Sequence, residues 1–256
     1  MVKKLFSSFF DKKEKRKPEY FEVDLHSHLI PGIDDGVKTL EESISIIKGL
    51  KDLGFKKIIT TPHIMSHRFP NTKEIILDGC EKVKEELSRQ NIDIKLEASA
   101  EYYFDEHFLE LIEKDDLLHF GKEKYVLFEL SYTSKPFGLE QTIFNLLSKG
   151  YRPILAHPER YSFFNSNFSK YDKLKNSGVR FQINLNSLVG FYGKKPKAAA
   201  KYLSDNALVD FVGSDIHSQR YLDSFSKAVF DKQTHELFEK NNIKNYKIAS
   251  YWGLSL

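Results

Sequence analysis

Two histidines separated by one residue, His26 and His28, follow a short strand-like run at residues 21–25. Because side chains at i and i+2 of a strand point to the same side, both imidazoles can reach one metal ion or two adjacent ions. The Gly- and Asp-rich turn that follows can bring a carboxylate, Asp34 or Asp35, back to the same place. Imidazole combined with carboxylate suits Zn, Mn or Fe. A pattern this short also arises by chance, so by itself it supports a metal site and a chance occurrence equally.

The rest of the chain places metal-binding residue types after six of seven predicted strands. The strands are expected at residues 21–25, 57–61, 94–100, 125–128, 153–156, 179–183 and 208–213. The residues at the six strand ends are His26 and His28, His63, Glu101, Glu129, His157, and Asp215 with His217; the sixth strand ends instead at Asn184 and Asn186. The C-terminal strand ends of an α/β barrel meet on one face, whereas those of an open sheet would spread along a line. The ligand pattern therefore favours a closed barrel.

This set of histidines and carboxylates exceeds what one ion can use, so two or three ions are expected, with a carboxylate such as Glu101 bridging them. Clusters of this kind hold the attacking and leaving oxygens in phosphoester hydrolysis. No Gly-rich phosphate loop, Gly-x-Ser-x-Gly elbow or Cys-x5-Arg signature occurs. The single cysteine, Cys80, has no arginine loop after it and is expected to be inert, which argues against cysteine-based phosphatase chemistry.

Arginines close to the predicted strand ends are candidates for holding a phosphate. Arg160 lies three residues after His157, where a guanidinium could bind phosphate bidentately. An ordinary surface ion pair with Glu159 is the alternative. Arg220, after the seventh strand, could play a similar part, and Arg68 is a weaker candidate. Aromatic residues also crowd the predicted loops, where they could line a cleft for an aromatic substrate or simply pack the loops together. They are Tyr102, Tyr103, Phe104, Tyr132, Phe137, Tyr161, Phe163, Phe191 and Tyr192.

The remaining histidines are expected to be surface or packing residues, because they fall in loop or helix contexts. They are His67, His107, His119 and His235. His67 is the least certain of them, since it lies in the loop just after His63.

Local patterns predict helices between the strands. Thr39 begins a capping box for a helix that stops at Gly54, Asn71 is expected to cap a second helix, and residues 139–147 form another. Residues 246–249 are expected to form a short extra strand. Strand ends about thirty residues apart indicate repeated βα units and a parallel sheet.

Length and composition fit one large α/β domain. The chain has 256 residues and a net charge of +3, with basic residues interspersed among acids, which does not favour nucleic-acid binding. Residues 1–20 are expected to be a flexible basic extension, although this tail could touch a membrane surface or an acidic partner. Residues 21–256 are expected to form the catalytic domain. No membrane span or signal peptide of adequate length is found, and with a lone cysteine the expected location is the cytoplasm.

The chain resembles the PHP (polymerase and histidinol phosphatase) superfamily, and within it the bacterial manganese-dependent protein-tyrosine phosphatases of capsule and exopolysaccharide synthesis. The resemblance covers residue 21 to about the C-terminus. Its motifs are DLHSHLIPGIDDG (residues 24–36), TPH (61–63), AEYY (100–103), FE (128–129), HPER (157–160) and GSDIH (213–217). The long first motif and HPER are specific for the subfamily, whereas His-x-His alone would suggest only the superfamily.

The resemblance implies a distorted (β/α)7 TIM-like barrel that holds a three-metal cluster, with Mn²⁺ as cofactor and Fe or Zn as possible substitutes. It also implies that Arg160 and a later arginine, for which Arg220 is the candidate, bind the phosphate, and that Asp35 takes part in catalysis. The implied substrate is phosphotyrosine in the tyrosine-rich tail of a polysaccharide-assembly kinase, attacked by hydroxide activated at the metals. By matching position, the metal ligands would be His26, His28, Asp35, His63, Glu101, Glu129, His157, Asp215 and His217.

Two other functions stay open at this point. The chain could be a phosphatase of a small phosphomonoester such as histidinol phosphate, or a phosphodiesterase; a deep narrow pocket would favour these, and a broad aromatic cleft a protein tail. It could instead be a metal-stabilised module that only docks a kinase, although the complete ligand set argues against that. Nucleic-acid binding is the least supported, because no basic stripe is present.

Overall fold

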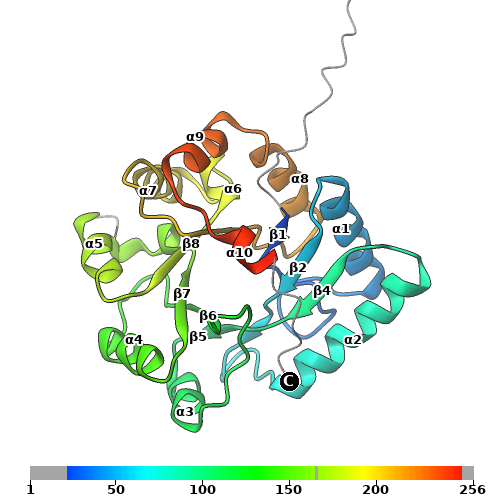
Figure 1. The fold of residues 1–256 in the computed structure, drawn as a ribbon, viewed down its shortest axis with the longest axis horizontal. Helices are drawn as coiled ribbons and strands as arrows, with labels where there is room; N and C mark the ends of the chain where they lie inside the picture. Colours follow the sequence, from blue (N-terminus) through cyan, green and yellow to red (C-terminus); the bar gives the residue numbers. More distant parts are fainter. Residues whose placement is uncertain (1–21, 165–166, 250–256) are drawn as a thin grey trace, which may run out of the picture.

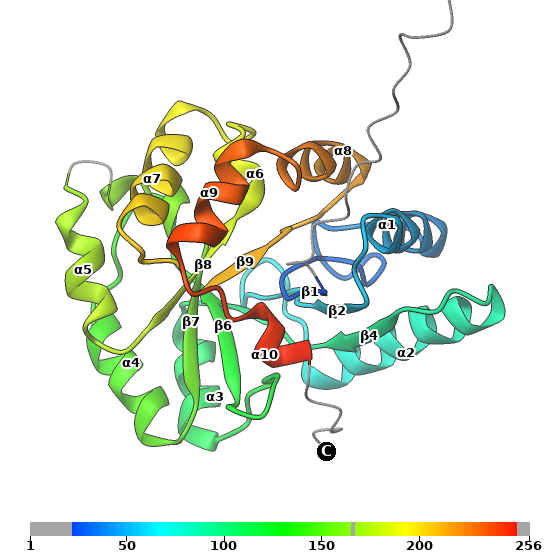
Figure 2. The ribbon, with the colours of Figure 1, turned by 45° about the horizontal axis from the view of Figure 1, so that its top comes forward.

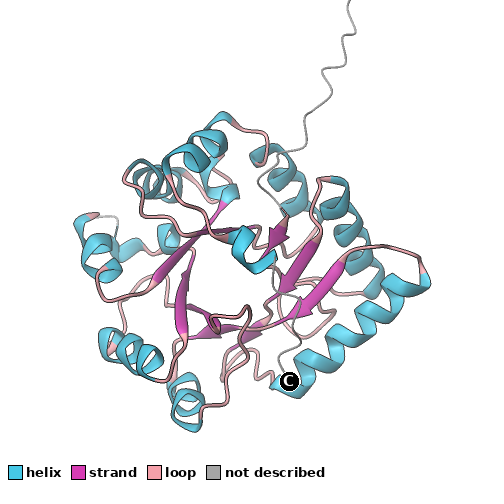
Figure 3. Ribbon diagram, viewed as in Figure 1, coloured by secondary structure: helices cyan, strands magenta, loops and turns pink. Residues whose placement is uncertain are grey.

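Parallel strands form a ring, and helices cover its outside (Figures 1 and 3). The structure, a computed structural model, describes residues 22–164 and 167–249. The predicted N-terminal extension at residues 1–20 lies outside the described residues. Within the part of the chain that the structure describes, no helix is long and apolar enough to span a bilayer.

The strands form two all-parallel sheets, of order β1-β2-β4 and β3-β5-β6-β7-β8-β9. Their bounds are β1 (Val23–Asp24), β2 (Lys57–Thr60), β3 (His63–Ile64), β4 (Lys95–Ala98), β5 (Glu101–Tyr103), β6 (Tyr125–Glu129), β7 (Arg152–Ala156), β8 (Arg180–Asn184) and β9 (Phe211–Gly213).

The ring closes between the first and last strands. The backbone N–H of His28 donates to the carbonyl of Ile216 at 2.9 Å, and the N–H of Asp215 donates to the carbonyl of His26 at 2.8 Å. These bonds flank a parallel bridge between Ser27 and Ile216. The closed α/β barrel expected from the strand-end pattern is therefore confirmed.

Two strands expected to be continuous are each broken in two, which corrects the predictions for residues 57–61 and 94–100. Pro62, which has no N–H to donate to a ladder, separates β2 from β3. The second break, at Ser99, separates β4 from β5, and across it Ser99 N–H still donates to the Thr60 carbonyl at 2.9 Å. His63 and Glu101 thus begin short new strands that pair with each other, instead of ending the previous ones. Counting β2 with β3 and β4 with β5, the ring has seven strand positions.

Ten α-helices and two short 3₁₀ segments connect the strands in the described residues. Their bounds are α1 (Leu40–Asp52), α2 (Lys73–Arg89), α3 (Glu106–Lys114), α4 (Leu139–Ser148), η1 (Pro158–Arg160), η2 (Ser162–Phe164), α5 (Ser169–Lys175), α6 (Leu185–Leu188), α7 (Lys194–Asp205), α8 (Gln219–Ala228), α9 (Lys232–Lys240) and α10 (Asn245–Ala249). Figure 2 shows α1 and α2 beside β2 and β4, and α4 beside β7.

The two predicted helix caps have different outcomes. The Thr39 cap is confirmed, since its hydroxyl accepts the N–H of Glu42 at 3.2 Å. The Asn71 cap is wrong: Thr72 caps α2, and the Asn71 side chain instead donates to the carbonyls of His63 at 2.8 Å and Ile33 at 3.0 Å. Asn71 therefore ties the loop after β3 to the loop after β1, a contact between distant segments.

The extra strand predicted at residues 246–249 is also wrong, because this segment belongs to helix α10. Figure 1 shows α10 across the opening of the ring. Asn245 bonds the carbonyl of Val23 and both backbone groups of Val212, and Ile248 packs into the apolar cluster inside the ring. The buried side chains of this segment, Asn245 and Ile248, lie about one helical turn apart. The strand-like alternation of the segment did not predict this spacing.

A buried carboxylate at the start of the last strand supports the fold electrostatically. Asp210 is buried and accepts the N–H of Phe181 at 2.9 Å. Its oxygens also pair with the ammonium groups of Lys175 and Lys244 and lie 3.4 Å from a nitrogen of Arg180.

We expect Asp210→Asn to lower the free energy of unfolding by about 2–4 kcal/mol, because the three cations would lose their shared anion while only partly exposed to water. A shift of the urea unfolding midpoint measures it. Asp205→Asn is the matched control, since Asp205 pairs with Lys201 and Lys240 at the surface and should cost less than about 1 kcal/mol. Equal midpoints for the two variants would contradict the prediction.

Candidate metal centre

All nine residues predicted as metal ligands meet at one end of the barrel. They fall into four overlapping groups whose ligand atoms lie within 4.8 Å of one another. The groups are His28, Asp35, His63 and His217; His26, His28 and Glu101; His26, His157 and Asp215; and His63, Glu101 and Glu129. The shared members place the groups side by side, as a cluster of several ions requires.

Glu101 lies at the centre of the cluster. Its Oε2 is 3.2 Å from Nε2 of His26, 3.4 Å from Nε2 of His28 and 3.2 Å from Nδ1 of His63, and its Oε1 is 2.9 Å from Nε2 of His157. The buried Oε2 nevertheless accepts no hydrogen bond. A buried carboxylate oxygen that faces three imidazole nitrogens without a hydrogen bond is well suited to metal cations, so the residues present fit the metal centre.

The two carboxylate oxygens of Asp215 have different neighbours: one faces a histidine of the cluster, and the other accepts hydrogen bonds from side chains outside it. Oδ1 lies 3.3 Å from Nε2 of His26, whereas Oδ2 accepts from the side chains of Asn184 at 2.6 Å and Arg160 at 2.9 Å. The backbones of Asp215 (φ 51°) and His157 (φ 34°) both adopt left-handed conformations, which residues other than glycine rarely adopt. Strain of this kind gathers at functional sites, where the surroundings hold side chains in place.

The outer part of the cluster opens toward solvent at Asp35. Asp35 Oδ1 lies 3.4 Å from Nε2 of both His63 and His217, and its side chain is 39% exposed. His63 reaches inward with its other nitrogen, Nδ1, which lies 3.1 Å from Oε1 of Glu129. Substrate arriving from solvent would therefore meet Asp35 and His217 before Glu101.

The first two histidines are oriented by hydrogen bonds on their far nitrogens. Nδ1 of His26 lies 2.8 Å from Oε1 of Gln182, and Nδ1 of His28 lies 2.7 Å from Oδ2 of Asp34. Neutral imidazoles that keep their protons on Nδ1 would present Nε2 lone pairs to the cluster. Of the two candidate carboxylates in this loop, Asp34 thus orients a histidine, while Asp35 belongs to a group of potential ligands. Sequence reasoning missed Gln182, because residues 26 and 182 are brought together only by barrel closure.

Three carboxylates in and beside the cluster, those of Glu101, Asp215 and Asp34, are held in their ionised form. Burial acts to raise the pKa of Glu101, but the neighbouring His26 and His63 outweigh it and lower that pKa well below its usual value. Asp215 behaves in the same way, with His26 and His217 opposing its burial to lower the pKa. His28 lowers the pKa of Asp34 to about 2 against the effect of burial. The cluster therefore offers anionic oxygens to cations at neutral pH.

We expect Asp34→Asn to weaken the binding of the activating metal by about 10- to 100-fold, because His28 loses the carboxylate that orients it. The metal concentration at half-maximal binding, measured by titrating metal-stripped protein, checks this. Asp52→Asn makes the same chemical change at an exposed position on α1 and should leave metal binding unaltered. Unaltered binding in Asp34→Asn as well would assign Asp34 to the fold alone.

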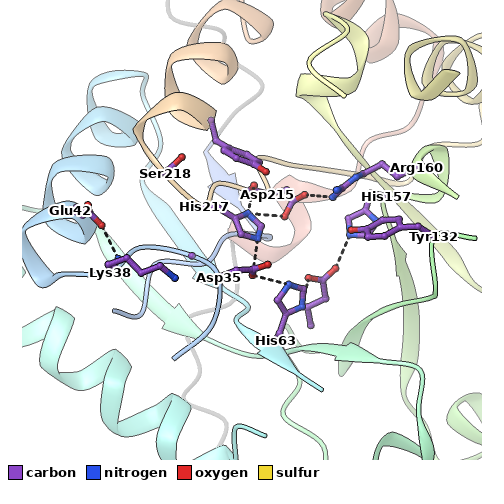
Figure 4. A pocket seen from close by; sticks show the side chains of 13 residues that line it. Asp35, Lys38, Glu42, His63, Tyr132, His157, Arg160, Asp215, His217 and Ser218 are labelled. Carbon is purple, nitrogen blue, oxygen red and sulfur yellow. Dashed lines mark hydrogen bonds and ion pairs between the residues drawn. The ribbon is translucent and has the colours of Figure 1, made fainter. Parts of the chain in front are cut away.

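A pocket of about 400 Å³ opens over the cluster (Figure 4). Arg160 lines it, with one guanidinium nitrogen 2.9 Å from Oδ2 of Asp215. The guanidinium carbon lies 4.7 Å from the ring centre of Tyr132 and 4.4 Å from that of Tyr192, so two aromatic faces hold it. A planar donor fork fixed beside a group of potential metal ligands is suited to binding phosphate.

Lys38 also lines this pocket, and sequence reasoning missed it. Figure 4 shows it across the pocket from Arg160, and its ammonium donates to the backbone carbonyl of Asp34 at 2.8 Å. The only sequence signal was its position two residues after Gly36. Arg220, in contrast, is not among the residues that line this pocket. Its guanidinium lies 5.3 Å from the ring centre of Phe191, so its role as second phosphate-binding arginine stays a prediction.

The other histidines agree with the surface or packing interpretation. None of His67, His107, His119 and His235 belongs to a group of potential ligands in the described residues. His67 lines a neighbouring pocket on the far side of His63 and Tyr132.

Comparison with known proteins agrees with this architecture. The family model for capsular polysaccharide synthesis, CpsB/CapC, matches residues 22–244. The tyrosine-protein phosphatase YwqE of Bacillus subtilis is 30% identical over 196 residues, which cover 77% of each chain. The tyrosine-protein phosphatase CpsB of Streptococcus agalactiae serotype V is 29% identical over 201 residues, or 77% of this chain and 83% of that one.

Solved structures give the same result. A crystal structure from a study of YwqE of Bacillus subtilis and CpsB of Streptococcus pneumoniae, described as metal-dependent tyrosine phosphatases, superposes with a TM-score of 0.72 at 28% identity, covering 85% of this chain and 91% of that one. A lactonase from Listeria monocytogenes superposes with a TM-score of 0.53 at 11% identity and shares the fold alone. The resemblance stated from the motifs is confirmed: the chain belongs to the CpsB/CapC family of capsular polysaccharide synthesis.

Proposed function

We propose that this chain, a metal-dependent tyrosine-protein phosphatase of the CpsB/CapC family, removes phosphate from a tyrosine kinase of polysaccharide assembly, with Mn²⁺ as its cofactor. The observation that carries the proposal is the set of four overlapping ligand groups, two of which contain Glu101, with Arg160 in the same pocket. The cytoplasmic location expected from the sequence remains a prediction.

Nine side chains would hold two or three ions, with Glu101 bridging them. When bound, such ions would supply a nucleophilic water at neutral pH and positive charge for the phosphoryl oxygens. The ligands would be His26, His28, Asp35, His63, Glu101, Glu129, His157, Asp215 and His217. Imidazole and carboxylate suit Mn, Fe and Zn alike, so metal availability would select among them.

Arg160 would bind the phosphate oxygens that face away from the cluster. Its charge is held in place by Asp215 and by two tyrosine rings, so little reorganisation is needed when a phosphate enters. Lys38, on the opposite wall, would supply a second positive charge near the opening. The aromatic rings of Tyr132 and Tyr221 line the same pocket, where they can pack against the ring of a phosphotyrosine.

An assay of metal-stripped protein tests the proposal. Phosphate release from a phosphotyrosine peptide should return when Mn²⁺ is added, with Fe²⁺ and Zn²⁺ as parallel arms. A phosphoserine peptide and histidinol phosphate serve as competing substrates. Faster turnover of histidinol phosphate would favour the metabolite phosphatase, and metal binding without turnover of any substrate would favour the docking module.

A further inference from the structure

A second pocket, of about 510 Å³, lies beside the metal-lined pocket and shares Asp35, His63 and Tyr132 with it. Its remaining wall includes the partly buried side chains of Met65, Phe69 and Tyr103. Two exposed basic residues, His67 and Arg68, lie at its edge. The wall also contains Glu129, one of the proposed metal ligands, but the proposed hydrolysis does not use the apolar and basic groups, so this part of the pocket needs an explanation of its own.

The basic edge is presented by a short, well-anchored hairpin at residues 65–69. The backbone N–H of Met65 donates to the carbonyl of Phe69 and the reverse bond is also made, both at 2.9 Å. Ser66 donates from its backbone and its hydroxyl to Oδ2 of Asp105, at 3.0 and 2.8 Å. The ring of Phe69 stacks on that of His63, with centres 5.5 Å apart. The hairpin tip is therefore fixed relative to the metal ligands.

Arg68 at this tip points its charge at the boundary between the two pockets. Its guanidinium carbon lies 4.8 Å from the ring centre of Phe69, and its side chain is 64% exposed. The carboxylate oxygen beside it, Oδ2 of Asp35, is 3.7 Å away, beyond hydrogen-bond distance. Oδ1 of Asp35 meanwhile faces His63 and His217. Arg68 thus pairs with Asp35 only at ion-pair range, without a hydrogen bond between the side chains, and its exposed donors remain accessible to an arriving anion.

We propose that the second pocket binds the polypeptide next to the phosphotyrosine, and that Arg68 selects substrates with an acidic side chain at that place. The inference rests on the proposed phosphatase function and deepens it. Because the two pockets share a wall, a peptide whose phosphotyrosine enters the first pocket can place the residues on one side of it in the second pocket. The apolar surfaces of Met65, Phe69 and Tyr103 can cover an extended segment, and the arginine pairs with a carboxylate on it.

The test compares three substrates in the metal-loaded enzyme: free phosphotyrosine, a phosphotyrosine peptide flanked on both sides by glutamate, and the same peptide flanked by glutamine. We expect the wild type to favour the glutamate peptide in kcat/KM by about two- to five-fold, the range of one exposed ion pair. Arg68→Ala should bring the ratio to about one, mainly through KM, and Arg68→Glu should reverse it. Higher salt should weaken the wild-type preference.

Free phosphotyrosine separates the possible failures, because it has no flanking residues. Arg89→Ala removes the same charge from an exposed site on α2, where the partner is Glu86, and should keep the wild-type ratio. A ratio unchanged by Arg68→Ala would overturn the inference. A fall with free phosphotyrosine as large as that with the peptides would overturn it too, and would assign Arg68 to the metal-lined pocket through Asp35. No turnover of free phosphotyrosine by the wild type would overturn the proposed function itself.

Discussion

Glu101→Gln is expected to abolish metal-dependent phosphate release, lowering kcat/KM by about 10³-fold or more, which corresponds to about 4 kcal/mol of lost transition-state stabilisation. Four imidazole nitrogens lie 2.9–3.4 Å from the two oxygens of Glu101. Glutamine keeps the shape but removes the charge, and its amide nitrogen offers no ligand in place of one oxygen. A single substitution should therefore disturb every ion that Glu101 joins.

Metal content and phosphate release together check this expectation. Element analysis should find fewer bound ions per chain in Glu101→Gln than in the wild type, alongside the lost activity. Glu110→Gln, at an exposed position on α3 beside Lys114, makes the same chemical change and should keep both properties. If Glu101→Gln kept its full metal content and activity, the bridging role would have to move to another carboxylate, such as Asp215.

The strand-end pattern predicted the closed barrel and eight of the nine residues of the cluster because both follow from local chemistry; the ninth, Asp35, was singled out from Asp34 by the family resemblance. A run of β-branched and aromatic residues followed by His, Asp or Glu can be recognised within about ten residues. The geometry of a barrel then brings the strand ends together on one face, and this can be predicted without knowing individual contacts. Glu101 and Glu129, more than seventy residues after the first histidine pair, could for this reason be assigned to the same site.

The errors concern features that depend on contacts between distant segments. Asn71 is of a residue type that often caps helices, but its side chain donates to the carbonyls of His63 in β3 and of Ile33 in the first loop, and Thr72 caps α2 instead. The alternation at residues 246–249 resembles a strand, yet Asn245 and Ile248 close the barrel end as part of a helix. Local propensity is a weak guide where tertiary packing decides the outcome.

Gln182 and Lys38 were missed for the same reason. Gln182 lies in a predicted strand, and nothing near it in the sequence indicates that its amide contacts His26. Lys38 looks like any polar residue before a helix, and only the folded first loop brings it to the pocket of Arg160. The potential metal ligands could be recognised by type, whereas the contacts that Gln182 and Lys38 make required the structure.

Arg160→Ala is expected to lower kcat/KM on phosphotyrosine peptides by about 10²- to 10³-fold while the bound metal stays in place, the usual effect of removing one fixed donor from a developing anion. Arg160→Lys should recover only part of the loss, because an ammonium restores the charge but not the planar fork held between Tyr132 and Tyr192. Arg152→Ala, at the opposite end of β7, should leave catalysis unaltered.

Measuring metal content in the same samples separates two explanations of a loss, since Arg160 also donates to Asp215 within the cluster. Activity lost with metal retained places Arg160 on the phosphate; activity and metal lost together would make it a support for Asp215.

Arg220→Ala and Lys38→Met in the same assay then identify the second phosphate contact. Lys38 lines the pocket of Arg160 and Arg220 does not, so we expect the larger loss from Lys38→Met. A larger loss from Arg220→Ala would instead require α8 to bring Arg220 toward the pocket when substrate binds.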